Sequence, residues 1–318
     1  MISISNLTKS FGTRQVIDTL SIEIGQEIFS FLGPNGAGKT TVVNIICGLL
    51  PYDKGEVKIE GLNPRKKPDL VRQKIGLVSQ ETALYEYLTA RENLEFHAKF
   101  YGVPRVKRAQ KIQEALELAQ LEERANDRVG TFSGGMKRRL ALVRALIHDP
   151  DILVLDEPTL GIDVQNRNEI WTRILELKRS LNKTILVTTN YMDEADRLSD
   201  RCAILDHGKL VALDTPSNLK LSYAGGIRIE AVLKMPDDSQ LNALKSRLQQ
   251  ISPNTRFSTP EEDEYHIVMP ATGEANQLLA EVARIFQEFP KIGLKDLSLR
   301  EPTLDDVFLE LTGSKLRD

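Results

Sequence analysis

The feature that most constrains this chain is a glycine-rich motif near its N-terminus. Residues 33–40 have the sequence GPNGAGKT, which fits the pattern G-x-x-x-x-G-K-[ST] at every fixed position. A strand-like apolar run at residues 26–32 precedes the motif, and an apolar-periodic segment from residue 39 to about residue 50 predicts a helix after it. In that setting the glycines let backbone N–H groups turn inward, and the helix N-terminus adds the positive end of a dipole. The motif therefore predicts a phosphate-binding loop between a strand and a helix.

The side chains of this loop have the chemistry that a nucleotide with bound Mg²⁺ needs. Lys39 supplies a mobile positive charge for the β- and γ-phosphates. Thr40 offers a hydroxyl to Mg²⁺, which keeps most of its waters and takes few protein ligands. We expect the nucleotide to be contacted by Gly33, Pro34, Asn35, Gly36, Ala37, Gly38, Lys39, Thr40 and Thr41.

A second motif lies far downstream, where the apolar run at residues 152–155 predicts a buried strand. Two carboxylates, Asp156 and Glu157, follow it directly. Asp156 is placed to hold Mg²⁺ through water, and Glu157 to polarise an attacking water. An acidic strand exit is common by itself, but beside the phosphate loop it predicts a site that binds and hydrolyses a nucleotide.

Charge and pattern divide the chain near residue 220. Residues 1–220 carry 31 Lys and Arg against 29 Asp and Glu, a balance of +2, whereas residues 221–318 carry 11 against 16, a balance of −5. Strands alternate with helices in the first part, including helices at about 87–101, 105–119 and 134–146, which is typical of a largely parallel sheet covered on both faces. The second part has the order β-α-β-β-α-β plus a terminal helix, typical of a ferredoxin-like unit. We therefore predict an α/β nucleotide-binding domain over residues 1–220 and a small α+β domain over residues 221–318.

Composition argues against several classes of protein. The formal net charge is −3, so no net positive field favours nucleic acid as a partner. Cys47 and Cys202 lie in apolar surroundings without metal-ligand spacing, and we expect them to be buried thiols. No run approaches the roughly 20 apolar residues that cross a bilayer, and the first residues lack the layout of a secretory signal. If the protein works at a membrane, a partner must hold it there.

A third motif, TFSGGMKRR at residues 131–139, places Ser133, Gly134 and Gly135 at a helix start. This arrangement creates a second anion site, although an ordinary serine N-cap gives the same pattern. Taken together and in this order, the motifs resemble the nucleotide-binding subunit of ATP-binding cassette (ABC) transporters over residues 1 to about 220. Phe132 is a mild departure, because the family usually has leucine there.

The resemblance implies a mixed, mainly parallel sheet with a helical subdomain, and it assigns further residues to a site for ATP and Mg²⁺. Phe11 matches the aromatic that stacks on adenine, Gln80 the glutamine that touches Mg²⁺ and senses the γ-phosphate, and Asp163 the aspartate that crosses the dimer interface. In this family two cassettes, identical or different, bind head to tail around shared ATP. Ser133 and Gly135 would then act on the partner's nucleotide. ATP binding closes such a dimer, and hydrolysis with product release opens it.

The resemblance also implies partners in the membrane. Cassettes without a spanning segment work under separately encoded polytopic membrane subunits, at the cytoplasmic face of the cell membrane. Residues 81–102 resemble the segment that grips a helix of the membrane subunit, and they contain the aromatics Tyr85, Tyr87, Phe96, Phe100 and Tyr101. The alternative for each of these aromatics is a place in the core.

One position departs from the family pattern. The family usually has T-T-H-Y-M-E-E-A, whereas residues 188–195 are TTNYMDEA, so Asn190 replaces a histidine that contacts the γ-phosphate and orients the catalytic water. An amide donates a hydrogen bond to phosphate, but it cannot become cationic or shuttle a proton. Three interpretations remain open: a tolerated substitution with Glu157 doing the chemistry, a slow site beside a competent partner cassette, or a protein that uses ATP mainly as a closure switch.

The C-terminal residues narrow the subfamily. Residues 298–313 are similar to the ending of cassettes from daunorubicin-resistance-type, nodulation-factor and other ABC-2-type exporters. Their apolar helix face, Leu304, Val307, Phe308 and Leu311, suits either packing within the domain or a dimer contact. The resemblance favours an ATPase subunit that powers export through membrane subunits. The alternatives are a soluble ABC ATPase on ribosomes or DNA and a mainly ATP-binding regulatory subunit.

Overall fold

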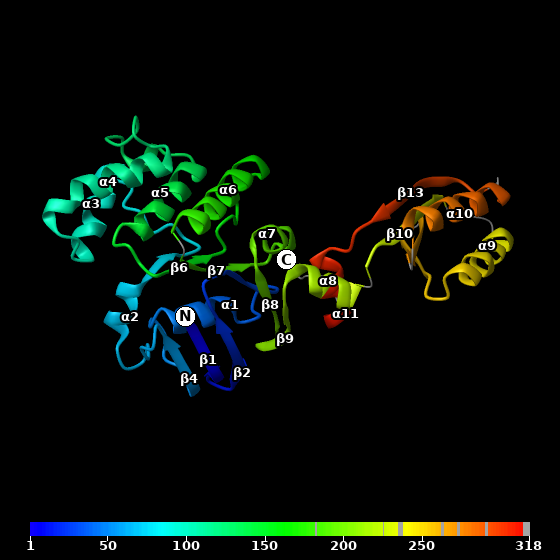
Figure 1. Ribbon diagram of the computed structural model, residues 1–318, viewed down its shortest axis with the longest axis horizontal. Helices are drawn as coiled ribbons and strands as arrows, with labels where there is room; N and C mark the ends of the chain where they lie inside the picture. Colours follow the sequence, from blue (N-terminus) through cyan, green and yellow to red (C-terminus); the bar gives the residue numbers. More distant parts are fainter. Residues whose placement is uncertain are drawn as a thin grey trace. The chain divides into compact units, whose positions relative to one another are not determined.

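The computed structural model describes residues 1–181, 183–224, 226–234, 238–261, 264–271, 274–289 and 292–313. Within these ranges the chain forms two compact units, Met1–Pro216 and Ser217–Gly313 (Figure 1). The units divide at the start of helix α8 (Pro216–Ala224), close to the point where the charge balance of the sequence changes.

The first unit is built on a six-stranded sheet with the order β5-β6-β7-β3-β8-β9. All neighbouring strands are parallel except the antiparallel pair β8 and β9. Every residue of β3, β6 and β7 is buried, which explains why these strands are nearly continuous apolar runs in the sequence. The strands are β3 (Ile28–Leu32), β5 (Ile75–Val78), β6 (Ile152–Asp156), β7 (Thr184–Thr189), β8 (Arg201–Asp206) and β9 (Lys209–Asp214).

A separate three-stranded antiparallel sheet precedes it, with the order β2-β1-β4. Its strands are β1 (Ile2–Phe11), β2 (Arg14–Ile24) and β4 (Lys54–Ile59). These three strands do not join the parallel sheet. Ile22 and Ile24 of β2 are buried while Glu23 is exposed, the alternation of a sheet with one covered face.

Helix α1 (Lys39–Ile46) lies between the two sheets and gives Val42, Ile45 and Ile46 to their shared core. The prediction that this helix continues to about residue 50 is wrong. Gly48 has a φ of 66°, and the N–H groups of Leu49 and Leu50 turn back to the carbonyl of Asn44. A glycine in the left-handed region is a common helix stop.

A group of helices stands beside the sheets: α3 (Ala90–Phe100), α4 (Arg105–Ala119) and α5 (Gly134–Leu146) (Figure 1). They share an apolar cluster of their own, and α5 also packs on β5, where Ala141 and Leu142 join a second cluster with Val78. Helix α3 begins after Thr89, later than predicted, because Thr89 and Glu92 form a capping box. Helices α2 (Pro68–Lys74), α6 (Val164–Leu181) and α7 (Met192–Leu198) complete the unit.

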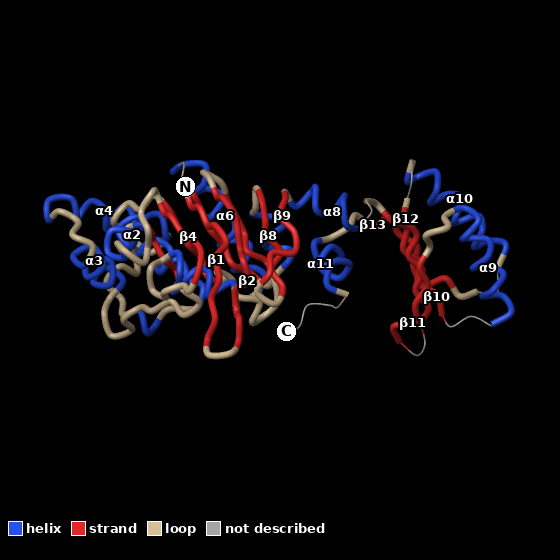
Figure 2. Tube along the Cα trace, turned by 90° about the horizontal axis from the view of Figure 1, so that it is seen from below, coloured by secondary structure: helices blue, strands red, loops and turns tan. Residues whose placement is uncertain are grey.

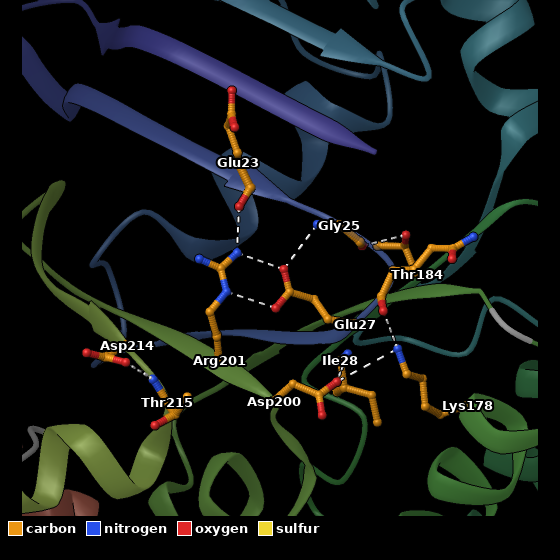
Figure 3. A network of polar contacts seen from close by, with 11 residues as sticks. Glu23, Gly25, Glu27, Ile28, Lys178, Thr184, Asp200, Arg201, Asp214 and Thr215 are labelled. Carbon is orange, nitrogen blue, oxygen red and sulfur yellow. Dashed lines mark hydrogen bonds and ion pairs between the residues drawn. The ribbon is translucent and has the colours of Figure 1, made fainter.

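The amino ends of the central strands are tied together by polar contacts (Figure 3). Arg201 on β8 donates two hydrogen bonds to Glu27 just before β3, at 2.7 and 2.9 Å, and a third to the carbonyl of Glu23. Asp200 accepts from the backbone N–H of Ile28 at 2.7 Å. These contacts occupy the amino ends of the strands. A ligand site is therefore expected at the carboxyl ends of the same strands.

The second unit contains the predicted order β-α-β-β-α-β. Its sheet has the order β11-β12-β10-β13 with every pair antiparallel, and α9 and α10 lie on the same side of it (Figure 2). Ile229, Ala231 and Leu233 alternate along β10 and face the apolar cluster with these helices. The elements are β10 (Arg228–Lys234), α9 (Asp238–Ile251), β11 (Arg256–Glu261), β12 (Glu264–Pro270), α10 (Ala275–Glu288), β13 (Leu294–Arg300) and the closing helix α11 (Leu304–Thr312).

Candidate functional site

The glycine-rich loop leaves the carboxyl end of β3 and opens α1, as its motif predicts. Two of its glycines are required by geometry. A Cβ at Gly33 would lie 2.2 Å from the carbonyl oxygen of Leu205. Gly38 has a φ of 108°, and a Cβ there would lie 2.9 Å from the carbonyl oxygen of Val16. The loop therefore fits tightly against strands β8 and β2, and a side chain at either glycine would disturb this fit.

Lys39 is buried inside this loop. Its ammonium donates hydrogen bonds to the carbonyl oxygens of Gly33 at 2.7 Å and Pro34 at 3.1 Å. Burial lowers the pKa of Lys39, while the nearby carboxylates of Glu157 and Asp156 act in the opposite direction. The loop thus holds a desolvated cation at the position where a phosphate would lie.

The acidic pair reaches the loop from β6. The carboxylate of Asp156 accepts hydrogen bonds from the hydroxyls of Thr188 and, at 3.4 Å, Thr40. The carboxylate of Glu157 lies 3.8 Å from the ammonium of Lys39. The structure therefore brings together the two motifs that the sequence separates.

Glu157 is held in an unusual backbone conformation, with a φ of 47°. Its N–H donates to both oxygens of Thr188, the carbonyl at 3.0 Å and the hydroxyl at 3.1 Å. A non-glycine residue in this region persists only when its surroundings fix it, and such residues cluster at functional sites. Thr188 is one of the residues that fix it here, because it binds both Glu157 and Asp156.

The loop and Glu157 border a cavity of about 500 Å³, and Asp156 is connected to its lining through Thr40. Among the residues predicted for the site, Phe11, Asn35, Gly36, Gly38, Lys39, Thr40, Thr41, Gln80 and Glu157 line it. Gly33, Pro34 and Ala37 are outside that lining; the carbonyls of Gly33 and Pro34 accept hydrogen bonds from Lys39, and the N–H of Ala37 donates to Pro34. Arg14, Val16 and Leu160 line it too, and sequence reasoning missed them. The short hairpin turn after Phe11 was the available signal, since Arg14 lies directly opposite Phe11 in the β1–β2 register.

The residues of the third motif lie outside the lining of this cavity, as far as the described part of the chain extends. Ser133 caps α5 and accepts a hydrogen bond from the N–H of Met136 at 3.3 Å. Asn166 connects this motif to Asp163: it donates two hydrogen bonds to the Asp163 carboxylate, and its side-chain oxygen lies 3.1 Å from a Cβ built at Gly135. Ser133, Gly134, Gly135 and Asp163 thus form a second surface of the same unit.

Asn190 follows β7 at the carboxyl edge that also bears the phosphate loop, since Thr189 pairs with Leu32. Its side-chain oxygen is buried and has no hydrogen-bond partner among the described residues. The next residue, Tyr191, is fixed by its N–H bond to the Thr189 hydroxyl at 2.9 Å and by the guanidinium of Arg167 at 4.3 Å from its ring centroid.

The aromatics of residues 81–102 are mostly on the surface. Tyr87 is 89% exposed and Phe100 75%, and Tyr85 and Phe96 are exposed as well, with their rings in contact. The core alternative is therefore wrong for these four. Tyr101 differs, because its ring stacks on His148 at 3.9 Å.

Two further sequence expectations concern the thiols and the membrane. Cys47 and Cys202 are both buried, and burial raises the pKa of each to about 12. None of the helices in the described ranges combines the length and the apolar character needed to span a bilayer.

Comparison with known proteins agrees with this geometry. A model of the ABC transporter family matches residues 18–160. The chain is 38% identical to the linearmycin resistance ATP-binding protein LnrL of Bacillus subtilis, over the full length of both chains. It is 37% identical to the daunorubicin resistance ATP-binding protein DrrA2 of Streptomyces coeruleorubidus, covering 97% of this chain and 94% of the relative. It is also 37% identical to the Nod factor export ATP-binding protein I of Sinorhizobium fredii, covering 100% and 87%.

Among solved structures, the chain resembles a dimeric ATP-binding cassette in a post-hydrolysis state with ADP and Pi. That match has a TM-score of 0.61 and 30% identity, and it covers 68% of this chain and 98% of the other. The sequence similarity over the whole length and the assembled phosphate loop lead to one conclusion. The chain belongs to the ABC transporter family, as an ATP-binding cassette ATPase similar to those of drug-resistance and Nod-factor exporters.

Proposed function

We propose that the protein is the ATP-hydrolysing subunit of an ABC-2-type exporter and drives export through separately encoded polytopic membrane subunits. One observation carries this proposal: Lys39, Thr40 and Glu157 line one cavity, and Asp156 contacts Thr40. A buried ammonium and hard oxygen groups at a phosphate loop suit ATP with Mg²⁺.

Thr40 and Asp156 are the residues that would hold Mg²⁺, with Gln80 at the cavity beside them. Their oxygens lie 3.4 Å apart, and Thr40 lines the cavity; such a pair suits a small cation that takes few protein ligands and keeps its waters. Bound Mg²⁺ would neutralise charge on the β- and γ-phosphates. Thr188 orients the Asp156 carboxylate for this role by donating to it.

For hydrolysis, Glu157 is the residue that polarises the attacking water. Its carboxylate is buried beside Lys39, and its backbone is fixed by Thr188, so its position needs little reorganisation. Asn190 donates its amide to the γ-phosphate, and Phe11 at the cavity mouth stacks on adenine. The absence of a cationic group at Asn190 supports a slow site, or one used mainly for ATP-driven closure, as the second candidate function.

A second cassette, identical or different, completes the site. Ser133, Gly134, Gly135 and Asp163 lie away from the cavity that their own chain forms, so they are available to a nucleotide held by a partner. In the head-to-tail dimer of the family, these residues of one cassette face the nucleotide of the other. ATP binding closes the dimer because both subunits then contact the same ligand.

The exposed aromatics of residues 81–102 support contact with a membrane subunit at the cytoplasmic face of the cell membrane. Aromatic side chains are enriched in the cores of protein interfaces, and an exposed group of them marks an interaction site. Tyr87 and Phe100 are the most exposed of this group.

Co-purification from detergent extract tests the proposal. We expect the protein to bring down a polytopic membrane protein, and the complex to hydrolyse ATP in a manner abolished by Glu157→Gln. Recovery with ribosomes or DNA, or an unchanged ATPase rate in that variant, would overturn it.

A further inference from the structure

We propose that Arg138 is a positioning residue that links the two nucleotide sites of the dimer: it joins helix α5, whose start serves the partner's nucleotide, to the segments that carry Gln80 and Glu157. The inference rests on the proposed function, since it needs two cassettes that share ATP.

Arg138 lies on α5 five residues after Ser133 and is only 5% exposed. One guanidinium nitrogen donates to the carbonyl oxygens of Ser79 at 2.8 Å and Gln80 at 3.4 Å. The other donates to the carbonyl oxygens of Asp156 at 3.2 Å and Glu157 at 3.0 Å. One side chain therefore holds the backbone of both segments at the points where they leave β5 and β6.

These bonds fix the backbone on which the chemistry depends. Two of them end on the carbonyls of Gln80 and Glu157, which line the cavity, and Glu157 already has a φ of 47°. A planar guanidinium directs N–H donors from two nitrogens in fixed directions, so it can bind two neighbouring segments at once. A lysine ammonium is a point charge without this fixed geometry. A small shift of α5 would therefore move Gln80 and Glu157 together.

The guanidinium stays charged in this setting. Burial lowers the pKa of Arg138 to about 10, against the attraction of the carboxylates of Glu194, Asp156 and Glu157. A buried cation is costly unless it is well bonded, so the four carbonyl contacts must be kept as a set.

The start of α5, just before Arg138, carries Ser133 and Gly135, which face the partner's nucleotide in the proposed dimer. At 1.5 Å per residue, about 7.5 Å of continuous helix separates Ser133 from Arg138. Displacement of the helix start by a bound nucleotide is transmitted along this rigid element to Arg138. Occupancy of one site thereby adjusts the catalytic groups of the other.

Arg144 offers a matched comparison on the same helix. It is also buried, and it donates to the carbonyls of Ala83 at 2.5 Å and Thr82 at 3.0 Å. It therefore anchors the chain beyond Gln80 but does not touch the Glu157 segment.

The test uses the full-length protein in complex with its membrane subunits and compares Arg138→Lys and Arg138→Gln with Arg144→Lys. For both Arg138 variants we expect kcat for ATP to fall about 10- to 100-fold, as for a small misplacement of catalytic groups. The Hill coefficient for ATP hydrolysis should fall toward 1. The Kd of a fluorescent ATP analogue for the isolated cassette should stay within about twofold of the wild-type value. Arg144→Lys should lower the melting temperature but keep the Hill coefficient.

Two results would overturn the inference. The first is a Hill coefficient of 1 for the wild-type complex. The second is an Arg138→Lys variant whose melting temperature is lowered but whose Hill coefficient is that of wild type. The second would make Arg138 a structural anchor only. Failure of the proposed function is separate, since it would appear as absence of ATP hydrolysis by the wild-type complex.

Discussion

The ammonium of Lys39 lies 3.8 Å from the carboxylate of Glu157, and both groups are buried. They belong to motifs on β3 and β6, which are separated in the sheet by β7. The phosphate-binding cation and the candidate base are thus preassembled. This arrangement lets binding and hydrolysis be separated by substitution.

Glu157→Gln should abolish most hydrolysis while keeping ATP bound. The amide has the shape of the carboxylate but cannot act as a base, so we expect kcat to fall about 10²- to 10⁴-fold. The loop and Lys39 remain, so the Kd for ATP should change little. Steady-state ATPase rates and nucleotide titration check this, with Glu169→Gln on the exposed face of α6 as the control. An equal fall in both variants would contradict it.

Asn190→His should raise the ATPase rate. An imidazole can make the charge-assisted contact that an amide cannot, and one such contact to a transition state contributes about 2–4 kcal/mol. We therefore expect a gain of at least about tenfold in kcat, measured beside Asn190→Gln, which keeps the amide. If the histidine variant is no faster than wild type, Asn190 does not limit turnover.

The sequence predicts the loop and the acidic pair because each is a local motif with fixed spacing. It does not predict Arg138, because a guanidinium that binds four backbone carbonyls has no partner side chain to suggest it. Strand β4 is missed for a related reason. Its residues Lys54, Gly55 and Glu56 are exposed, and only its pairing with β1 makes them a strand.

Glu194 should make stability depend on pH. Its carboxyl is fully buried, where it accepts hydrogen bonds from Thr159 and Trp171 at 2.8 Å each, and burial raises its pKa above the ordinary value of 4.5. A raised pKa means that the folded state keeps its proton longer. The stabilisation is therefore complete below about pH 4.5 and is lost as pH rises through the folded-state pKa.

Relative to Glu194→Gln, wild type should lose unfolding free energy as pH rises from 4.5 toward 8, because glutamine does not titrate. Chemical denaturation across this range measures the difference, and Glu194→Ala, which leaves the Thr159 and Trp171 donors without an acceptor, should be less stable at every pH. A difference between wild type and the glutamine variant that does not change with pH would refute a raised pKa.

The ion pair between Arg201 and Glu27 should make stability depend on pH in the opposite direction. Burial tends to raise the pKa of Glu27, but the hydrogen bonds from Arg201 and from the Gly25 N–H, with the charge of Arg201, lower it overall. The pair therefore stabilises the fold above about pH 4.5 and loses this effect as pH falls through the lowered pKa. Arg201→Gln should cost about 1 kcal/mol at pH 7, given the partial exposure of Arg201, and less at pH 4. Denaturation of both proteins at the two pH values checks this, and a cost that grows at low pH would contradict it.

Tyr87→Ser and Phe100→Ser should weaken binding to the membrane subunit without affecting the nucleotide site. Both side chains are strongly exposed and lie apart from the residues that line the cavity, so their removal takes apolar area from the proposed interface alone. We expect less membrane protein to co-purify with the double variant, while the Kd for ATP and the melting temperature of the isolated cassette stay at wild-type values. Tyr223→Ser, which removes an exposed aromatic from α8, serves as the matched control. Full recovery of the membrane subunit with the double variant would show that this segment does not hold it.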